Sequence, residues 1–150
     1  MAGEGRLDAV VLAMAGLNRA GLAEPYGQYL HPLDPEQIIP AAGQGLLALQ
    51  AMAHRADVAQ VLACIEDAES RAALEAERAV LRGLEAGCQS CLAIHIGRAG
   101  GRWAGRAMVA RPDGRDMIRL SCEAASSATA GLDLLSRLIE GGADRLLAQP

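Results

Sequence analysis

A change in the hydrophobic period along the chain limits its fold more than any other sequence feature. Between residues 57 and 86 apolar side chains recur at helical spacing, which predicts two successive helices. From Leu92 to Gly97 the period becomes two, as in a half-buried strand, and strand-like stretches follow at 102–110 and 117–122. A helical pattern returns after these stretches. The order predicts helices, then a three-stranded antiparallel sheet, then a final helix.

Capping and turn residues mark the ends of these elements. Ser70 lies in the expected N-cap region of the second helix, and Gly87 is its expected C-terminal stop. Arg111-Pro-Asp-Gly predicts a turn between the last two strands, because proline presets φ and glycine accepts a left-handed backbone. These signals agree with the periods on either side of them.

The final helix completes the domain. Ser126 or Ser127 is its expected N-cap, and Gly141-Gly142 is its expected end. No element is predicted for 144–148. We expect 52–150 to form one compact α+β domain, with helices packed on the antiparallel sheet. The predicted apolar face of the final helix carries Leu132, Leu135 and Ile139.

Composition predicts an unusual core and excludes several partners. The 150 residues are 51% hydrophobic but include no Phe, one Trp and two Tyr, so small aliphatic side chains must fill the core. The net charge of −4 argues against a nucleic-acid partner, because phosphates are bound by clustered cations. No run approaches the ~20 apolar residues that cross a bilayer, and no secretion signal is evident. We expect a soluble, cytoplasmic protein with reduced cysteines and no membrane partner.

The N-terminal segment predicts elements that lack neighbours. Residues 8–13 are typical of a short buried strand, and a helical stretch from Ala15 ends at Gly21. A strand and a helix alone cannot bury both of their faces. We therefore expect the chain to begin partway through a larger fold.

A second short segment precedes the α+β domain. Residues 24–37 contain three prolines and are expected to form a loop. In Gly43-Gln44-Gly45 the two glycines allow the backbone to approach another strand or a ligand closely. Residues 46–51 are then expected to form a buried strand.

Cys88 lies on a short loop between a helix end and a strand start, and from spacing alone its role stays open. A cysteine can be a small buried hydrophobe, which suits Cys64 and Cys122 better than Cys88. Cys88 and Cys91 form a Cys-x-x-Cys pair that could be redox-active or bind metal. The preceding helix presents its C-terminal end, which does not stabilise a thiolate. A structural zinc site needs about four ligands, and only Cys64, Cys122 and His95 could complete one.

Three ordered motifs resemble the hydroxymethylbilane synthase (porphobilinogen deaminase) family. Glu77-Arg with the later Leu84-Glu-Ala-Gly-Cys-Gln is similar to the family's Glu-Arg followed by Leu-Glu-Gly-Gly-Cys-Gln. Asp8-Ala-Val-Val-Leu-Ala-Met-Ala-Gly-Leu-Asn-Arg is similar to Asp-Ala-Ile-Val-Leu-Ala-x-Ala-Gly-Leu-x-Arg. Ile39-Pro-Ala-Ala-Gly-Gln-Gly is similar to Leu-Pro-Ala-Val-Gly-Gln-Gly. The resemblance covers nearly the whole chain and identifies it with the C-terminal half of the family.

The resemblance implies an origin for each segment. It assigns 1–36 to the end of the family's second domain, 37–51 to a returning strand of its first, and 52–150 to its third. Residues 1–51 would thus be remnants of periplasmic-binding-protein-like α/β domains, and 52–150 would be the C-terminal cofactor-anchoring domain. The orphan strand and helix would belong to sheets whose other strands are absent.

The resemblance also implies a chemistry. The family joins four porphobilinogen molecules into hydroxymethylbilane with release of ammonia, in the biosynthesis of haem and other tetrapyrroles. Cys88 would carry the covalent dipyrromethane cofactor, with Gln44, Gly45, Leu12 and Ala13 lining the pyrrole site and no metal. The family's catalytic aspartate region has no counterpart here. The chain alone would be inactive, with a separate chain as one source of the missing half.

Two departures from the family pattern keep other functions in view. Ala86 replaces the second glycine before the cysteine, and Cys91 replaces a proline after it. A disulfide between Cys88 and Cys91 would block cofactor attachment. The alternatives are a non-catalytic binding or interaction module and a Cys-x-x-Cys metal or redox protein.

Overall fold

The computed structural model describes residues 5, 7–87 and 89–148. The chain divides into two units, Met1–Leu33 and Asp34–Pro150. Each is described by itself. Among the described residues, no helix is both long and apolar enough to span a membrane.

The first unit contains a short helix, α1 (Met14–Arg19), and a 3₁₀ helix, Gly27–Tyr29. Gly21 ends the α1 turn at φ 66°, and the N–H of Leu22 donates to the carbonyl of Leu17 at 2.9 Å. The predicted stop at Gly21 is therefore confirmed, since a left-handed glycine after the helix closes its last turn.

The strand predicted over 8–13 is wrong for this structure. No described residue of this segment is in a strand, and Val11 is 77% exposed. A strand exists only where a neighbour accepts its backbone hydrogen bonds, and none of the described residues pairs with this segment. The apolar run is present, but none of the described residues buries it.

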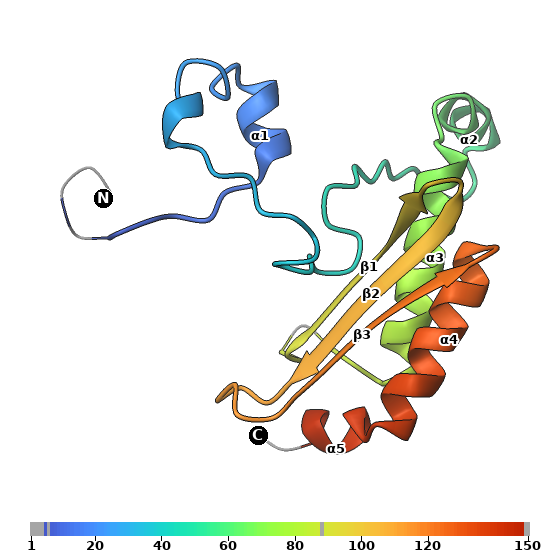
Figure 1. Ribbon diagram of the computed structural model, residues 1–150. Coiled ribbons are helices and arrows are strands. Elements are labelled where there is room, and N and C mark those ends of the chain that lie inside the picture. Colours follow the sequence, from blue (N-terminus) through green and yellow to red (C-terminus); the bar gives the residue numbers. More distant parts are fainter. Residues whose placement is uncertain (1–4, 6, 88, 149–150) are drawn as a thin grey trace. The chain divides into compact units, whose positions relative to one another are not determined.

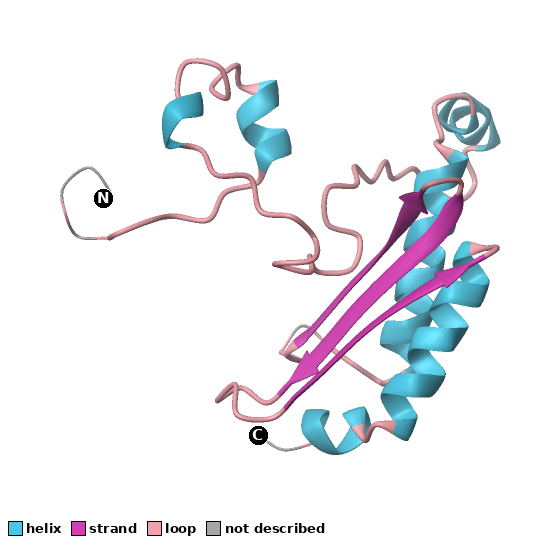
Figure 2. Ribbon diagram, in the orientation of Figure 1, coloured by secondary structure: helices cyan, strands magenta, loops and turns pink. Residues whose placement is uncertain are grey.

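The second unit is an α+β layer structure, as predicted. Its strands β1 (Leu92–Ala99), β2 (Arg102–Ala110) and β3 (Met117–Ala124) form an antiparallel meander in the order β1-β2-β3. Two helices lie side by side along one face of this sheet (Figures 1 and 2). They are α3 (Ala68–Gly83) and α4 (Ser127–Glu140).

The second unit contains two further helices. Helix α2 (Ala56–Ala63) precedes α3, and α5 (Ala143–Leu147) follows α4 and packs near β2. Helix α2 carries no buried residue, so Cys64 at its C-terminal end is exposed. The prediction that Cys64 is a buried hydrophobe is wrong, because the apolar stripe of α2 meets no core. Helix α5 occupies the segment for which no element was predicted.

The core between the helices and the sheet is built from small aliphatic residues, as the composition predicts. The largest fully buried side chains are Ile94, Ile96, Leu134, Leu138, Val80 and Val109. Trp103 is also buried, and Ala76, Ala107 and Ala130 fill the remaining contacts. Helices can approach the sheet closely because these side chains are short.

The face of α4 that packs on the sheet is not the predicted one. Leu134 and Leu138 are fully buried, whereas Leu132 is 67% exposed and Ile139 is also exposed. Leu135 is half-buried. Helix α4 has apolar residues on two sides, and periodicity alone cannot choose between them. The side of α4 that carries the small residues Ala130 and Gly131 lies against the sheet and α3. A Cβ on Gly131 would stand 3.1 Å from the Ala76 carbonyl oxygen.

The ends of the helices agree only partly with the predictions. Ser126 caps α4 by accepting a hydrogen bond from the Thr129 N–H at 3.1 Å, as predicted. In α3 the N-cap is Asp67, whose carboxylate accepts from the Ser70 N–H at 2.8 Å, so Ser70 is the donor. Short polar residues compete for the cap position, and the structure selects the one just before the first turn.

Helix α3 ends earlier than predicted, at Gly83 and not near Gly87. Glu85 takes a left-handed conformation at φ 52°. The N–H of Glu85 donates to Arg82 O at 3.1 Å, and the N–H of Ala86 donates to Leu81 O at 2.9 Å. This pair of bonds is the Schellman arrangement, here built without glycine at its left-handed position.

Of the remaining predictions, the one for a turn is correct and the one for a strand is not. The Arg111–Gly114 turn is confirmed, with Gly114 at φ 70° donating its N–H to Arg111 O at 2.9 Å. The strand predicted over 46–51 is wrong: the segment has no strand assignment and Leu47 is 77% exposed. A turn needs only its own four residues, whereas a strand needs a partner.

Candidate functional site

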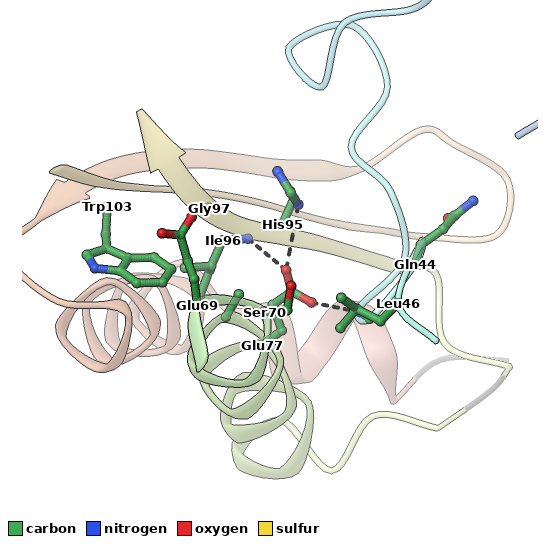
Figure 3. A pocket seen from close by; sticks show the side chains of 11 residues that line it. Gln44, Leu46, Glu69, Ser70, Glu77, His95, Ile96, Gly97 and Trp103 are labelled. Carbon is green, nitrogen blue, oxygen red and sulfur yellow. Dashed lines mark hydrogen bonds and ion pairs between the residues drawn. The ribbon is translucent and has the colours of Figure 1, made fainter. Parts of the chain in front are cut away.

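The Gly43-Gln44-Gly45 bend is a tight turn that uses its own side chain. Gly43 has φ 72° and Gly45 has φ 89°, which glycine adopts at little cost. The N–H of Gln44 donates to Ala41 O at 3.0 Å, and the N–H of Ala41 donates to Gln44 Oε1 at 3.1 Å. Gln44 is exposed, and its Nε2 end points away from the neighbouring cavity (Figure 3).

The bend lies against α3 and the edge of β1 that does not pair with β2. A Cβ on Gly43 would stand 2.9 Å from Leu74 Cδ1, the end of a half-buried side chain, and the φ of 72° would strain any residue other than glycine there. Just before the bend, the N–H of Ile94 in β1 donates to Pro40 O at 3.0 Å. The predicted neighbour of these glycines is another strand or a ligand, whereas in the structure Gly43 lies against the Leu74 side chain of α3 and a Cβ at Gly45 would meet nothing within 4 Å.

A cavity of about 180 Å³ lies between the bend, α3, β1 and β2 (Figure 3). The buried carboxylate of Glu77 stands at its base and is only 4% exposed. Glu77 Oε2 accepts from the Gly43 N–H at 2.7 Å, and Oε1 accepts from the Ile96 N–H at 2.8 Å. His95 Nδ1 is 3.7 Å from Glu77 Oε1. The other lining residues include Gln44, Leu46, Glu69, Ser70 and Trp103.

The chain after α3 makes a second short turn. The N–H of Gly87 donates to Ser90 Oγ at 3.0 Å, and the N–H of Ser90 donates to Gly87 O at 3.0 Å. Cys88, the predicted cofactor anchor, lies outside the described residues. Cys91 is a half-buried thiol. In the described ranges no three His, Cys, Asp or Glu side chains gather as metal ligands.

The predicted site residues fall in both units. Gln44 and Gly45 are exposed on the bend of the second unit. Leu12 and Ala13 are exposed just before α1 in the first unit. Gln44 and Gly45 thus lie on a defined turn of the second unit, and Leu12 and Ala13 lie in the first unit.

The sequence reasoning missed two features of the second unit. The first is the buried carboxylate of Glu77, a residue that the sequence marks only as part of a family motif. The second is an ion pair on the sheet face opposite α3 and α4, where Arg106 Nη2 lies 2.7 Å from Glu36 Oε1. Arg119 donates to the Glu36 carbonyl oxygen on the same face. A charged residue on an alternating strand was the available signal for this pair, but its partner stands 70 positions away.

Comparison with known proteins shows what this chain is similar to. Residues 1–60 match the family model described as "Porphobilinogen deaminase, dipyromethane cofactor binding domain". That segment includes Leu12, Ala13, Gln44 and Gly45. Two of the three ordered motifs, at 8–19 and 39–45, lie within this match.

Curated relatives extend the match along the chain. A porphobilinogen deaminase of Desulforudis audaxviator is 40% identical over 97% of this chain and 47% of its own length. Those of Nitratidesulfovibrio vulgaris (strain Miyazaki F) and Bordetella parapertussis are 37% and 41% identical over 97% of the chain. The chain spans about half the length of the curated relatives it matches. Over almost its entire length, it is therefore related to the C-terminal region of the porphobilinogen deaminases.

Proposed function

We propose that this chain is the C-terminal part of a cytoplasmic enzyme that joins four porphobilinogen molecules into hydroxymethylbilane and releases ammonia. The observation that carries the proposal is the 37–41% identity to porphobilinogen deaminases over 97% of the chain. In the sequence, Gly43-Gln44-Gly45 and Cys88 occupy the positions that the family motifs give to Gly-Gln-Gly and to the cysteine. Porphobilinogen and its pyrrole oligomers are then the ligands of the site.

The bend suits a pyrrole with acidic substituents. A Cβ at Gly45 would meet nothing within 4 Å, so the backbone there is open to a flat ring. Gln44 uses Oε1 within its own turn, and its Nε2 end remains exposed to donate to a carboxylate. Leu12 and Ala13 would pack against the rings. Cys88 would hold the dipyrromethane through a thioether, and when bound this group supplies the primer for the growing chain.

The two exposed apolar segments support the proposed division of the chain. Residues 7–13 and 46–51 offer apolar side chains and backbone groups without a strand partner among the described residues. We assign 1–51 to remnants of the family's second and first domains, and 52–150 to its cofactor-anchoring third domain. The family's N-terminal half would supply the strand partners of both segments, either from the same polypeptide or from a partner chain.

The chain by itself would not catalyse the reaction. The family's catalytic aspartate region, which stabilises positive charge on the pyrrole nitrogen, corresponds to no segment of this sequence. Electrostatic and acid–base assistance of this kind contributes roughly 10²–10⁴-fold to a rate. Turnover of porphobilinogen by the isolated chain would contradict this part of the proposal.

Covalent loading tests the function directly. The chain is produced with and without the N-terminal half of one of the relatives above, and its intact mass is measured. We expect a dipyrromethane adduct on wild type and on Cys91→Ser in the presence of that half, and none on Cys88→Ser. Bound zinc without an adduct would indicate the metal or redox alternative. Neither adduct nor zinc would indicate a non-catalytic binding module.

A further inference from the structure

The carboxylate of Glu77 connects three elements that are distant in sequence. It projects from α3, accepts from Gly43 at 2.7 Å across 34 positions, and accepts from Ile96 at 2.8 Å across 19 positions. Both oxygens are therefore occupied by backbone N–H groups at a site that is 4% exposed. A buried carboxylate is costly unless its oxygens are satisfied, so the arrangement holds only while both donors stay in place.

The second donor belongs to the outer edge of the sheet. Strand β1 pairs only with β2 among the described residues, so alternate N–H groups of β1 point away from the sheet. The N–H of Ile94 is taken by Pro40 O, and the next outward N–H, that of Ile96, is taken by Glu77. The Pro40 carbonyl and the Glu77 side chain thus accept from two successive outward N–H groups along the edge of β1. Glu77 acts where a neighbouring strand would otherwise continue.

The first donor belongs to the bend. Leu74 and Glu77 stand three residues apart on α3 and therefore share a face. Leu74 Cδ1 lies against Gly43, while Glu77 accepts a hydrogen bond from the N–H of the same residue. Gln44 follows directly and is tied to Ala41 by two hydrogen bonds. Glu77 therefore fixes the position of the Gln44 side chain indirectly, through its hydrogen bond to the neighbouring residue Gly43.

We infer that Glu77 is a positioning residue, whose carboxylate sets the Gly43–Gly45 bend against β1 and so places Gln44 for pyrrole binding. The second half of this statement rests on the proposed function. The Glu77 carboxylate does not need to touch a pyrrole for this role. A merely stabilising residue would protect the whole domain evenly, whereas a positioning residue controls the bend selectively.

Amide hydrogen exchange of the full 150-residue chain separates the two roles. The variants are Glu77→Gln, which replaces one acceptor with a donor, and Glu77→Asp, which keeps the charge on a shorter side chain. Glu75→Gln is the matched control, because Glu75 is an exposed residue of the same helix. The reference amide is Ala110, which donates to Cys91 O at 2.9 Å and not to the Glu77 carboxylate.

The readout is the ratio of the Gly43 exchange rate to the Ala110 exchange rate. We expect Glu77→Gln to raise this ratio by about tenfold or more through local opening, with a smaller rise for Glu77→Asp and no change for Glu75→Gln. A ratio that stays at the wild-type value or falls overturns the inference. Because global destabilisation accelerates both amides, the ratio remains decisive for a weakened variant.

Loading with the N-terminal half tests the link to the pyrrole. Glu77→Gln should lower the dipyrromethane adduct on the chain by about tenfold, whereas Glu75→Gln should load as wild type does. Normal loading of a Glu77→Gln chain whose Gly43 amide exchanges faster would overturn the positioning role. Absence of loading in wild type would refute the proposed function, and the exchange ratio alone would then decide whether Glu77 holds the bend.

Discussion

Gly105 of β2 faces Leu134 of α4 so closely that a Cβ on the glycine would stand 2.8 Å from Leu134 Cδ1. The same Cβ would lie 3.0 Å from Cys122 Sγ on the adjacent strand. Leu134 is fully buried and cannot swing into solvent. The missing side chain at Gly105 is therefore what permits α4 to pack at this distance from the sheet.

Replacing Gly105 with alanine should destabilise the second unit. Overpacking of a filled core typically costs about 1–3 kcal/mol, and the added methyl has two neighbours inside contact distance. The free energy of unfolding in urea measures the effect. Adding Leu134→Val, which removes a methylene at the clash, should make the double variant less unstable than the sum of the single changes. Additive costs would contradict this account of the packing.

Replacing Glu85 with glycine should stabilise the chain. Glu85 holds a left-handed backbone at φ 52° after α3, which costs a non-glycine residue roughly 1 kcal/mol. Glycine adopts the conformation freely, and the gain of about 0.5–1 kcal/mol should raise the urea midpoint at an unchanged m-value. Glu85→Ala retains the Cβ and serves as the control. An equal gain for alanine would show that the glutamate side chain, and not φ, is responsible.

The N-cap of α3 should make stability depend on pH in the acidic range. The side chain of Asp67 accepts hydrogen bonds from Ser70, and these lower the pKa of its carboxyl in the folded chain. A lowered pKa means that the stabilisation is complete above the pKa of the unfolded chain and is lost as pH falls through the folded value. The stability difference between wild type and Asp67→Ala should shrink accordingly below about pH 4.

Asp67→Asn provides the control for this prediction. Asparagine keeps an acceptor at the cap but has no titrating proton, so its difference from Asp67→Ala should stay constant with pH. Urea unfolding from pH 7 down into the acidic range measures both differences. A wild-type difference that also stays constant would show that the ionised carboxylate contributes nothing beyond its hydrogen bond.

Cysteine alkylation should distinguish Cys122 from Cys64. Burial, together with the nearby Asp133 carboxylate, raises the pKa of the Cys122 thiol, so a smaller fraction is thiolate at pH 8. Cys64 is exposed at the end of α2. We expect Cys122 to react with iodoacetamide about tenfold or more slowly than Cys64, measured by peptide mass spectrometry. The two rates should converge in urea, and equal rates in the native chain would contradict the packing of Cys122.

The elements whose signals are local were predictable from the sequence. The Arg111–Gly114 turn and the Ser126 cap need only their own few residues, and both are present as predicted. The three strands and the helices α2, α3 and α4 follow from the change of period, because alternation and helical spacing each specify one backbone geometry. Helix α5 was not predicted. The family motifs added a candidate site at Gln44 and Cys88, which no period or composition could supply.

What the tertiary structure decided lies in contacts between distant parts. Helix α4 has two apolar sides, and only the sheet determines that Leu134 and Leu138 are the buried ones. The Glu77 carboxylate finds Gly43 across 34 positions, a pairing that no local pattern encodes. The runs at 8–13 and 46–51 carry strand-like sequences but form no strand, because backbone hydrogen bonding and burial both require a neighbour. Sequence by itself determines what a segment can become, and packing partners determine whether it does.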